Sequence, residues 1–405
     1  MDLTLIVVLV IALALFFDFT NGFHDTANAM ATPIATGAMR PKVAVALAAV
    51  LNLVGAFLST EVAKTISGGI IKEGNGGVLI TPELIFAGLV GAVIWNMVTW
   101  LFGLPSSSSH ALFGGLIGAA IVGVGLGSVD FVVLLDKVVL PAVIAPVTAG
   151  VVAYSATKLA YWITRRFDGR PDGRGGFRYG QIFSSSLVAL AHGTNDAQKT
   201  MGIITLTLIA AGLQPAGTGP ETWVVVACAL AIAIGTYSGG WRIIRTLGRG
   251  LTEIKPAQGF AAETATAATI LASSHLGFAL STTQVASGSV IGSGLGRRGS
   301  SVRWGTAGRI ALGWLLTLPS AGIVGGVSAW LVDLGPIGVA IDALAALSVI
   351  VLIFRLSSRN KVDSENAVAP APVQGASEVA ASGRAVKIKK VKPLKKPRGK
   401  EKESA

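Results

Sequence analysis

The sequence predicts an all-α integral membrane protein built from two inverted-topology repeats, with about 10–12 membrane segments. Three observations lead to this fold class. Of the 405 residues, 52% are hydrophobic and 13% are charged, whereas a soluble protein carries about 25% charged residues. Several apolar runs reach the roughly 20 residues that a helix needs to cross a bilayer. Two polar motifs in the first half of the chain also recur in the second half.

Apolar segments follow one another along the chain, and each is expected to form a helix. They cover 3–36, 43–60, 82–104, 106–125, 131–163, 180–212, 222–240, 258–276, 281–295, 306–333 and 336–356. The 51 glycines are typical of helices that approach closely in lipid. The first segment has no basic region before it and no small-residue cleavage site, so we expect a retained membrane helix and not a signal peptide.

These segments and the charged stretches between them divide the chain into five parts. We expect a first repeat over 1–163, a basic hinge over 164–180, a second repeat over 181–333, an extra membrane helix over 334–356 and a disordered tail over 357–405. Cytoplasmic loops are enriched in Lys and Arg, so the hinge arginines predict a cytoplasmic hinge in a plasma-membrane protein. The last 22 residues hold ten basic and two acidic side chains, which favours an arm that touches anionic lipid and not nucleic acid.

Two separate motifs indicate one internal duplication. NGFHDTAN (21–28) matches HGTNDAQK (192–199) at an offset of 171 residues, and GLPSSSSH (103–110) matches GFALSTTQ (277–284) at an offset of 174 residues. If each apolar segment crosses once, the first half starts outside and the second half starts inside. Inverted repeats of this kind are typical of secondary transporters.

Charged residues inside the apolar segments need an explanation, because a charge at the bilayer centre costs at least about 2.5–3.5 kcal/mol. Asp25 and Asp196 occupy equivalent positions of the duplicated motif. We interpret them as sites of cation coordination or proton carriage, with a buried structural pair as the alternative. The neighbouring Gly and Asn residues predict that both helices unwind there. Lys199 either pairs with Asp196 or attracts an anion, and for Glu263 we favour a proton or cation site over a structural carboxylate.

The second motif places hydroxyl side chains at the start of an apolar helix in both halves. The clusters are Ser107, Ser108 and Ser109, and Ser281, Thr282 and Thr283. Hydroxyl residues cap helix N-termini and hold helices together in lipid. Two half-helix N-termini that face each other also offer hydroxyl donors and free N–H groups to one central anion. The recurrence of the cluster favours this binding interpretation.

Together the four motifs resemble the duplicated signatures of the inorganic phosphate transporter (Pit) family, in its bacterial low-affinity form. GFAAETA and WRIIRTLG fit the family too, and the resemblance covers about residues 5–356. It implies two inverted repeats with broken helices and with re-entrant hairpins that carry the Ser/Thr clusters. The implied activity is symport of inorganic phosphate into the cell, which is not enzymatic.

The same resemblance implies roles for individual residues. The six hydroxyl residues would hold phosphate oxygens. Asn28 and Gln198 would also line the phosphate site, and Asp25, Asp196 and Asn195 the site of the coupling cation, to which we add His24 and Glu263. Family members are often dimers, so a homodimer in the lipid bilayer is expected.

Departures from the family pattern bear on the coupling cation. His24 stands where the family more often has Asn, and Asn52 where many sodium-coupled members have Glu. Both favour a proton over sodium, and they favour bacterial members that carry phosphate also as a complex with a divalent metal. No cofactor and no structural metal are expected. Ala279 and Gln284 replace the usual Pro and His of the second hairpin, which changes the expected geometry there.

Three other classes of protein remain as alternatives. A channel would need a continuous polar pore and no paired carboxylates. A membrane enzyme would need a hydroxyl beside a histidine that a carboxylate orients, and the duplication argues against it. A sulfate transporter is the nearest alternative in substrate, but only phosphate carries a proton that it can donate to a carboxylate.

Overall fold

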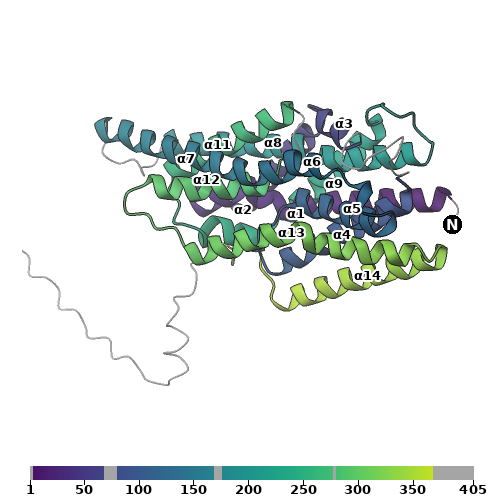
Figure 1. Cartoon of the computed structure of the whole chain (residues 1–405). Helices are drawn as coiled ribbons and strands as arrows, with labels where there is room; N and C mark the ends of the chain where they lie inside the picture. The colour runs from purple at the N-terminus through teal and green to yellow at the C-terminus, as the bar shows by residue number, and fades with distance from the viewer. Residues whose placement is uncertain (1–2, 68–79, 168–175, 277–279, 368–405) are drawn as a thin grey trace, which may run out of the picture. The chain divides into compact units, whose positions relative to one another are not determined.

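The structure is a computed structural model that describes residues 3–67, 80–167, 176–276 and 280–367. Within these residues all regular structure is helical, apart from one isolated bridge between Thr252 and Val302, so the predicted all-α fold class is confirmed (Figure 1). The α-helices are α1 (Leu3–Ala35), α2 (Pro41–Gly55), α3 (Glu61–Ser67), α4 (Pro82–Leu101), α5 (Ser108–Gly123), α6 (Phe131–Leu134), α7 (Leu140–Phe167), α8 (Gly176–Ala210), α9 (Thr222–Ser238), α10 (Trp241–Arg245), α11 (Pro256–His275), α12 (Thr282–Gly296), α13 (Trp304–Val332) and α14 (Pro336–Arg359). Short 3-10 or π turns cover Leu126–Ser128, Leu135–Val139 and Thr246–Gly250.

Every apolar segment expected from the sequence contains a helix, but some boundaries differ. The short helices α3 and α10 were not predicted. The expected hinge is partly helical, because α7 continues to Phe167 and α8 begins at Gly176. Helix α14 likewise extends into the expected tail, whose residues from 368 onward lie outside the described part of the chain.

Several of these helices are suited to span a membrane. Five described helical segments are long and apolar enough to cross: α1, α4, Phe131–Arg165, α13 and α14. Helix α9 and the segment Trp241–Gly250, which contains α10 and the π turn after it, are bent by 56° and would together make a sixth. The remaining helices are shorter or carry polar residues. The chain is therefore a multi-pass membrane protein.

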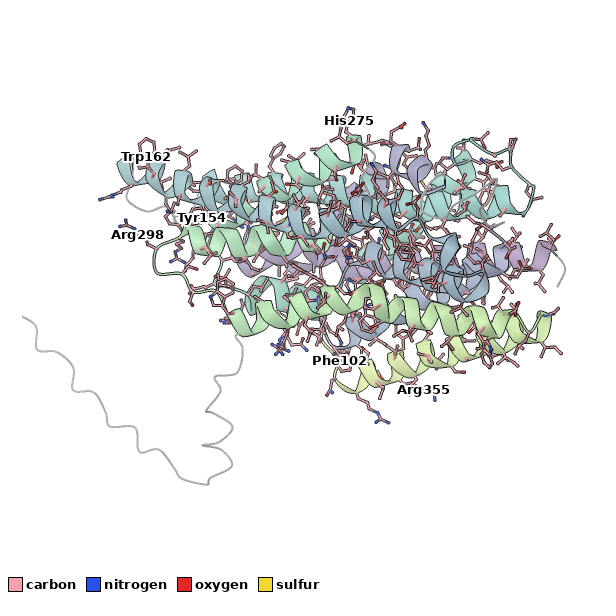
Figure 2. All side chains as sticks on the ribbon, in the orientation of Figure 1. Phe102, Tyr154, Trp162, His275, Arg298 and Arg355 are labelled. Carbon is pink, nitrogen blue, oxygen red and sulfur yellow. The ribbon has the colours of Figure 1, made fainter. Side chains whose placement is uncertain are left out.

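The basic ends of two helices lie on one side of the bundle. In Figure 2, Trp162 near the end of α7 and Arg298 after α12 lie at the end opposite the N-terminus marked in Figure 1. Arg165 also belongs to the last turn of α7. The two basic ends therefore lie together, and their assignment to the cytoplasmic side stays a prediction.

Helices α1 and α8 run without interruption through the two aspartate motifs. The expectation that they unwind at Asp25 and Asp196 is wrong, because both residues lie inside continuous helices of 33 and 35 residues. The breaks lie instead before the hydroxyl clusters, between α4 and α5 and between α11 and α12. The backbone carbonyls of α1 and α8 thus remain hydrogen-bonded within the helix, and the side chains supply the polar groups.

The glycines of the aspartate motifs allow neighbouring helices to approach closely, and they do not interrupt the helices. A Cβ atom on Gly22 of α1 would lie 2.3 Å from the carbonyl oxygen of Ile232 in α9. A Cβ atom on Gly193 of α8 would lie 2.2 Å from the carbonyl oxygen of Asn52 in α2. Equivalent glycines therefore make equivalent contacts between the two halves, since only a residue without a side chain lets the backbones approach so closely.

Each hydroxyl-bearing helix packs on a long helix of the other half. Helix α5 contacts α13, where a Cβ on Gly118 would lie 1.9 Å from the carbonyl oxygen of Gly322. Helix α12 contacts α7, where a Cβ on Gly292 would lie 2.0 Å from the carbonyl oxygen of Gly150. Gly118 and Gly292 are 174 residues apart, the offset of the hydroxyl motifs. The packing therefore follows the duplication that the motifs indicate.

Replacing one of these glycines should destabilise the protein. Gly292→Ala forces α12 away from α7 and should cost about 1–3 kcal/mol, which lowers the midpoint of thermal unfolding of the purified chain in detergent. Gly308→Ala in α13 is the control, because a Cβ there meets no atom within 4 Å. An unfolding midpoint of Gly292→Ala equal to that of the control would contradict the close contact.

Candidate functional site

Helices α1 and α8 bring the two motif aspartates together in the interior. Asp25 and Asp196 are 1% and 0% exposed. Nε2 of His192 lies 2.8 Å from Oδ2 of Asp196 and 3.9 Å from Oδ2 of Asp25. One ligand atom from each of these three residues lies within 4.8 Å of the other two. Such a group can take up a proton or a small cation.

His192 is a residue of this group that the sequence analysis did not select. Its position four residues before Asp196 was the available signal, because residues one turn apart lie on the same face of a helix. The repeat did not reveal it, since Asn21 stands at the equivalent position of the first motif.

The starts of α5 and α12 have the same capping geometry. The side-chain oxygen of Ser107 accepts a hydrogen bond from the N–H of His110 at 3.2 Å, and that of Ser281 accepts one from the N–H of Gln284 at 3.3 Å. The two helix starts also meet, because Nε2 of Gln284 lies 3.4 Å from Nδ1 of His110. Ser107 and Ser281, which were predicted to hold phosphate, are therefore engaged as helix N-caps.

Hydroxyl groups from both helix starts converge on the carboxylate of Asp25. Oγ1 of Thr283 donates to Oδ1 of Asp25 at 3.1 Å. Oγ of Ser108, at the equivalent of Thr282 in the first half, lies 3.5 Å from Oδ2 of Asp25. The N-terminal turns of α5 and α12 thus face one negative group, as the favourable interaction of helix N-termini with anions predicts.

Thr282 links the two carboxylates. Its Oγ1 lies 3.0 Å from Oδ2 of Asp25 and 3.0 Å from Oδ2 of Asp196. A hydroxyl has one proton and can donate to only one carboxylate at a time. If both carboxylates are ionised, one of them receives the hydrogen bond from Thr282. The other faces a lone pair of the hydroxyl oxygen, which repels it. An additional proton or cation between Asp25 and Asp196 would remove this repulsion.

His24 connects Asp25 to the first hairpin. Its Nδ1 lies 2.8 Å from Oδ1 of Asp25, and its Nε2 lies 3.3 Å from Oγ of Ser106 and 3.4 Å from Oγ1 of Thr99. Ser106 and Thr99 are themselves 2.7 Å apart. The imidazole therefore bridges the carboxylate and a hydroxyl pair, of which Thr99 lies in α4 and Ser106 in the segment between α4 and α5.

Lys199 pairs with Asp196, which is one of the two alternatives left open for it. Its Nζ donates to Oδ1 of Asp196 and, at 3.2 Å, to the carbonyl oxygen of Leu280. Oγ of Ser109 donates to the same carbonyl oxygen at 3.3 Å. The segment before α12 is thus held by side chains from α8 and α5.

Asn28 occupies the position of Lys199 in the first repeat but makes different contacts. Its Nδ2 donates to Oγ1 of Thr282 at 3.3 Å and to Oγ1 of Thr283 at 3.1 Å. The amide therefore orients the two hydroxyls toward the carboxylates. The two halves of the site are alike in their hydroxyls and carboxylates. They differ at this position and in the histidines, since His24 and His192 stand where the other repeat has Asn195 and Asn21.

Glu263 lies in a separate polar cluster. Its carboxylate accepts hydrogen bonds from Thr32, Ser185 and, at 3.0 Å, Ser184. Thr32 follows Asp25 by seven residues, which is about 10 Å along a helix at 1.5 Å per residue. The structure does not bring Glu263 into the group around Asp25.

Gln198 and Asn195 are also directed toward other elements. Oε1 of Gln198 accepts hydrogen bonds at 2.8 Å from the N–H of Val62 and at 3.3 Å from that of Ala63, at the start of α3. Nδ2 of Asn195 donates to Oγ of Ser274 in α11 at 2.9 Å. Both residues flank Asp196 on a helix, so their side chains project in other directions than its carboxylate. Ala279, which departs from the pattern of the second hairpin, lies outside the described residues.

Comparison with known proteins identifies relatives of the chain. The profile of the family described as "Phosphate transporter family" matches residues 21–173 and 164–325. A Mycobacterium leprae protein is 56% identical over 365 residues, which are 89% of this chain and 87% of the relative. A Bacillus subtilis protein is 41% identical over 341 residues, which are 82% and 99% of the two chains. Both are described as "Probable low-affinity inorganic phosphate transporter".

One solved structure has the same fold. It is described as "The sodium-dependent phosphate transporter" and superposes with a TM-score of 0.71 at 24% identity, covering 81% of this chain and 99% of its own. The family and the relatives are transporters, so the alternative of a membrane enzyme is excluded. The tandem family match also agrees with the duplicated motifs that meet around Asp25 and Asp196. By motif, fold and sequence identity, the chain belongs to the phosphate transporter family.

Proposed function

We propose that this protein imports inorganic phosphate across the plasma membrane together with protons. The observation that carries the proposal is the convergence of hydroxyl groups from two helix starts on the carboxylate of Asp25. The names of the Mycobacterium leprae and Bacillus subtilis relatives support the substrate. His24 and the shared hydroxyl of Thr282 support the proton.

In this proposal the carboxylate of Asp25 and a phosphate compete for the same donors. Thr283 lies 3.1 and 3.2 Å from the two oxygens of Asp25, and Thr282 lies 3.0 Å from one of them. A charged oxygen is a stronger acceptor than a neutral one. Phosphate therefore gains these hydroxyls most readily when Asp25 no longer carries a negative charge.

A proton on Asp25 makes the hydroxyls available to phosphate. The competition for these hydroxyls therefore couples phosphate binding to proton binding. The neutral acid holds the hydroxyls more weakly, and it does not repel the arriving anion. Proton binding thus favours phosphate binding, and phosphate binding must favour proton binding by the same factor. His24 lies 2.8 Å from the carboxylate and can pass the proton to it.

The second carboxylate favours phosphate over sulfate. Phosphate at neutral pH carries a proton that it can donate to the carboxylate of Asp196, whereas sulfate has none. A site with a buried acceptor left unpaired rejects the ligand that cannot donate. Hydroxyl donors also hold the anion without a fixed positive charge from arginine, so that the anion can leave again.

Uptake of labelled phosphate into proteoliposomes tests the proposal directly. We expect an inward proton gradient to drive accumulation, a sodium gradient alone to leave it unchanged, arsenate to compete and sulfate not to compete. Omission of divalent metals distinguishes free phosphate from a metal–phosphate complex as the transported species. Accumulation driven by sodium alone would contradict proton coupling, and equal competition by sulfate would contradict the assigned specificity.

Removing the hydroxyl of Thr282 should weaken phosphate binding. Thr282→Val keeps the shape of the side chain but loses a hydrogen bond to a charged group, so the phosphate KM should rise about 10–100-fold. Thr282→Ser should restore most of the affinity. Thr264→Val is the matched control, because Thr264 is exposed on α11 and bonds only to the carbonyl of Phe260 among the contacts described. An unchanged KM in Thr282→Val would remove this residue from the site.

Neutralising Asp25 should uncouple phosphate from the proton. Asp25→Asn cannot exchange a proton at this position, so proton-driven accumulation should fall about 100-fold or more, while the protein still reaches the membrane. Asp333→Asn, at the exposed end of α13, is the control. The measurement is initial uptake at equal protein content, with and without the gradient, and wild-type accumulation by Asp25→Asn would exclude the assigned role.

A further inference from the structure

We propose that the ammonium group of Lys199 is a tethered cation that permanently fills the cation position of the second repeat. The coupling ion would then exchange only at Asp25. This inference rests on the proposed function, because it states which half of the duplicated site remains free for coupling.

The first argument is the set of atoms that surround the ammonium group. Nζ of Lys199 contacts the carboxylate of Asp196 and the backbone carbonyl oxygen of Leu280. Carboxylate and carbonyl oxygens are the ligands that a hard cation takes in proteins. Lys199 is 1% exposed, and a buried ammonium group is tolerated only when such partners offset its lost hydration. The side chain thus occupies a position built for a positive charge.

The second argument comes from the comparison of the two repeats. Asn28 is the equivalent of Lys199, and its neutral amide contacts hydroxyls instead of a carboxylate. Within the described residues, the ion-pair partners of Asp25 are the imidazoles of His24 and His192. Asp25 therefore lacks the fixed cation that Asp196 has, although both aspartates occupy the same motif position.

The consequence concerns the number of ions carried with each phosphate. Two equivalent carboxylates with Asn at both positions would offer two exchangeable cation sites. With Lys199 in place, the charge of Asp196 is balanced inside the protein, and the tethered ammonium group cannot leave to either side of the membrane. The residue at position 199 thereby determines whether the second repeat takes part in coupling.

The test replaces Lys199 with the residue of the first repeat. Detergent-purified full-length Lys199→Asn is heated in sodium chloride and in choline chloride, without phosphate. A vacated cation site that binds sodium stabilises the folded state, so the unfolding midpoint should rise by about 3 °C or more in sodium. The wild-type midpoint should be the same in both salts. In proteoliposomes, sodium should stimulate phosphate uptake by the variant about 10-fold and should not stimulate the wild type.

Two control variants separate a tethered cation from a general effect of the substitution. Lys199→Arg keeps a positive charge at the position, so its midpoint should not respond to sodium. Lys64→Asn removes a lysine that also pairs with an acidic residue three positions earlier, Glu61, but at the surface with 52% of the side chain exposed. It too should not respond to sodium.

Distinct results would overturn the inference. One such result is a folded Lys199→Asn protein with the same unfolding midpoint in both salts and a raised phosphate KM. This result would show that Lys199 is a phosphate ligand. If Lys199→Asn and Lys199→Gln give no monodisperse protein in choline, sodium during extraction should restore it, and failure of this rescue also overturns the inference. The thermal measurement needs no phosphate, whereas wild-type proteoliposomes that take up no phosphate would refute the proposed function alone.

Discussion

The contact between Asp25 and the hydroxyl groups at two helix starts is the constraint on which the rest of the structure depends. Each of these groups is buried, so none of them can replace a lost partner with water. The hydroxyls of Thr282 and Thr283 must come from α12, that of Ser108 from α5, and the carboxylate from α1. Three helices from both halves of the chain must therefore be held in register to within the length of a hydrogen bond.

Glycine contacts provide this precision. Gly22 and Gly193 set the distance between helices of opposite halves near the aspartates, and Gly118 and Gly292 do the same for the helices that carry the hydroxyls. Lipid offers no hydrophobic drive for helices to associate, so backbone contact and interhelical hydrogen bonds must hold them. The polar group can remain in the interior because close backbone contacts and interhelical hydrogen bonds hold the surrounding helices together.

Much of this arrangement could be predicted from the sequence. The helices followed from apolar runs, and the equivalence of Asp25 and Asp196 followed from a duplication that two motifs indicate independently. The direct contact of Asp25 with Thr282 and Thr283 was not predicted. The error concerned the backbone, because Gly22 and Gly193 were interpreted as sites of unwinding when they are sites of close contact. Sequence does not distinguish these uses of glycine, since the difference depends on which helix lies opposite. The contact of Gln198 with α3 was missed for a related reason, because α3 is a seven-residue helix without a clear sequence signal.

The exchange of partners between the halves has a mechanical consequence. Helix α5 rests on α13 and helix α12 rests on α7, each through glycines that permit no gap. A tilt of either long helix would thus displace the hydroxyl-bearing helix of the opposite repeat. Because of these contacts, neither repeat can change its tilt without displacing the other. In such a linkage, opening toward one face of the membrane and closing toward the other are a single movement.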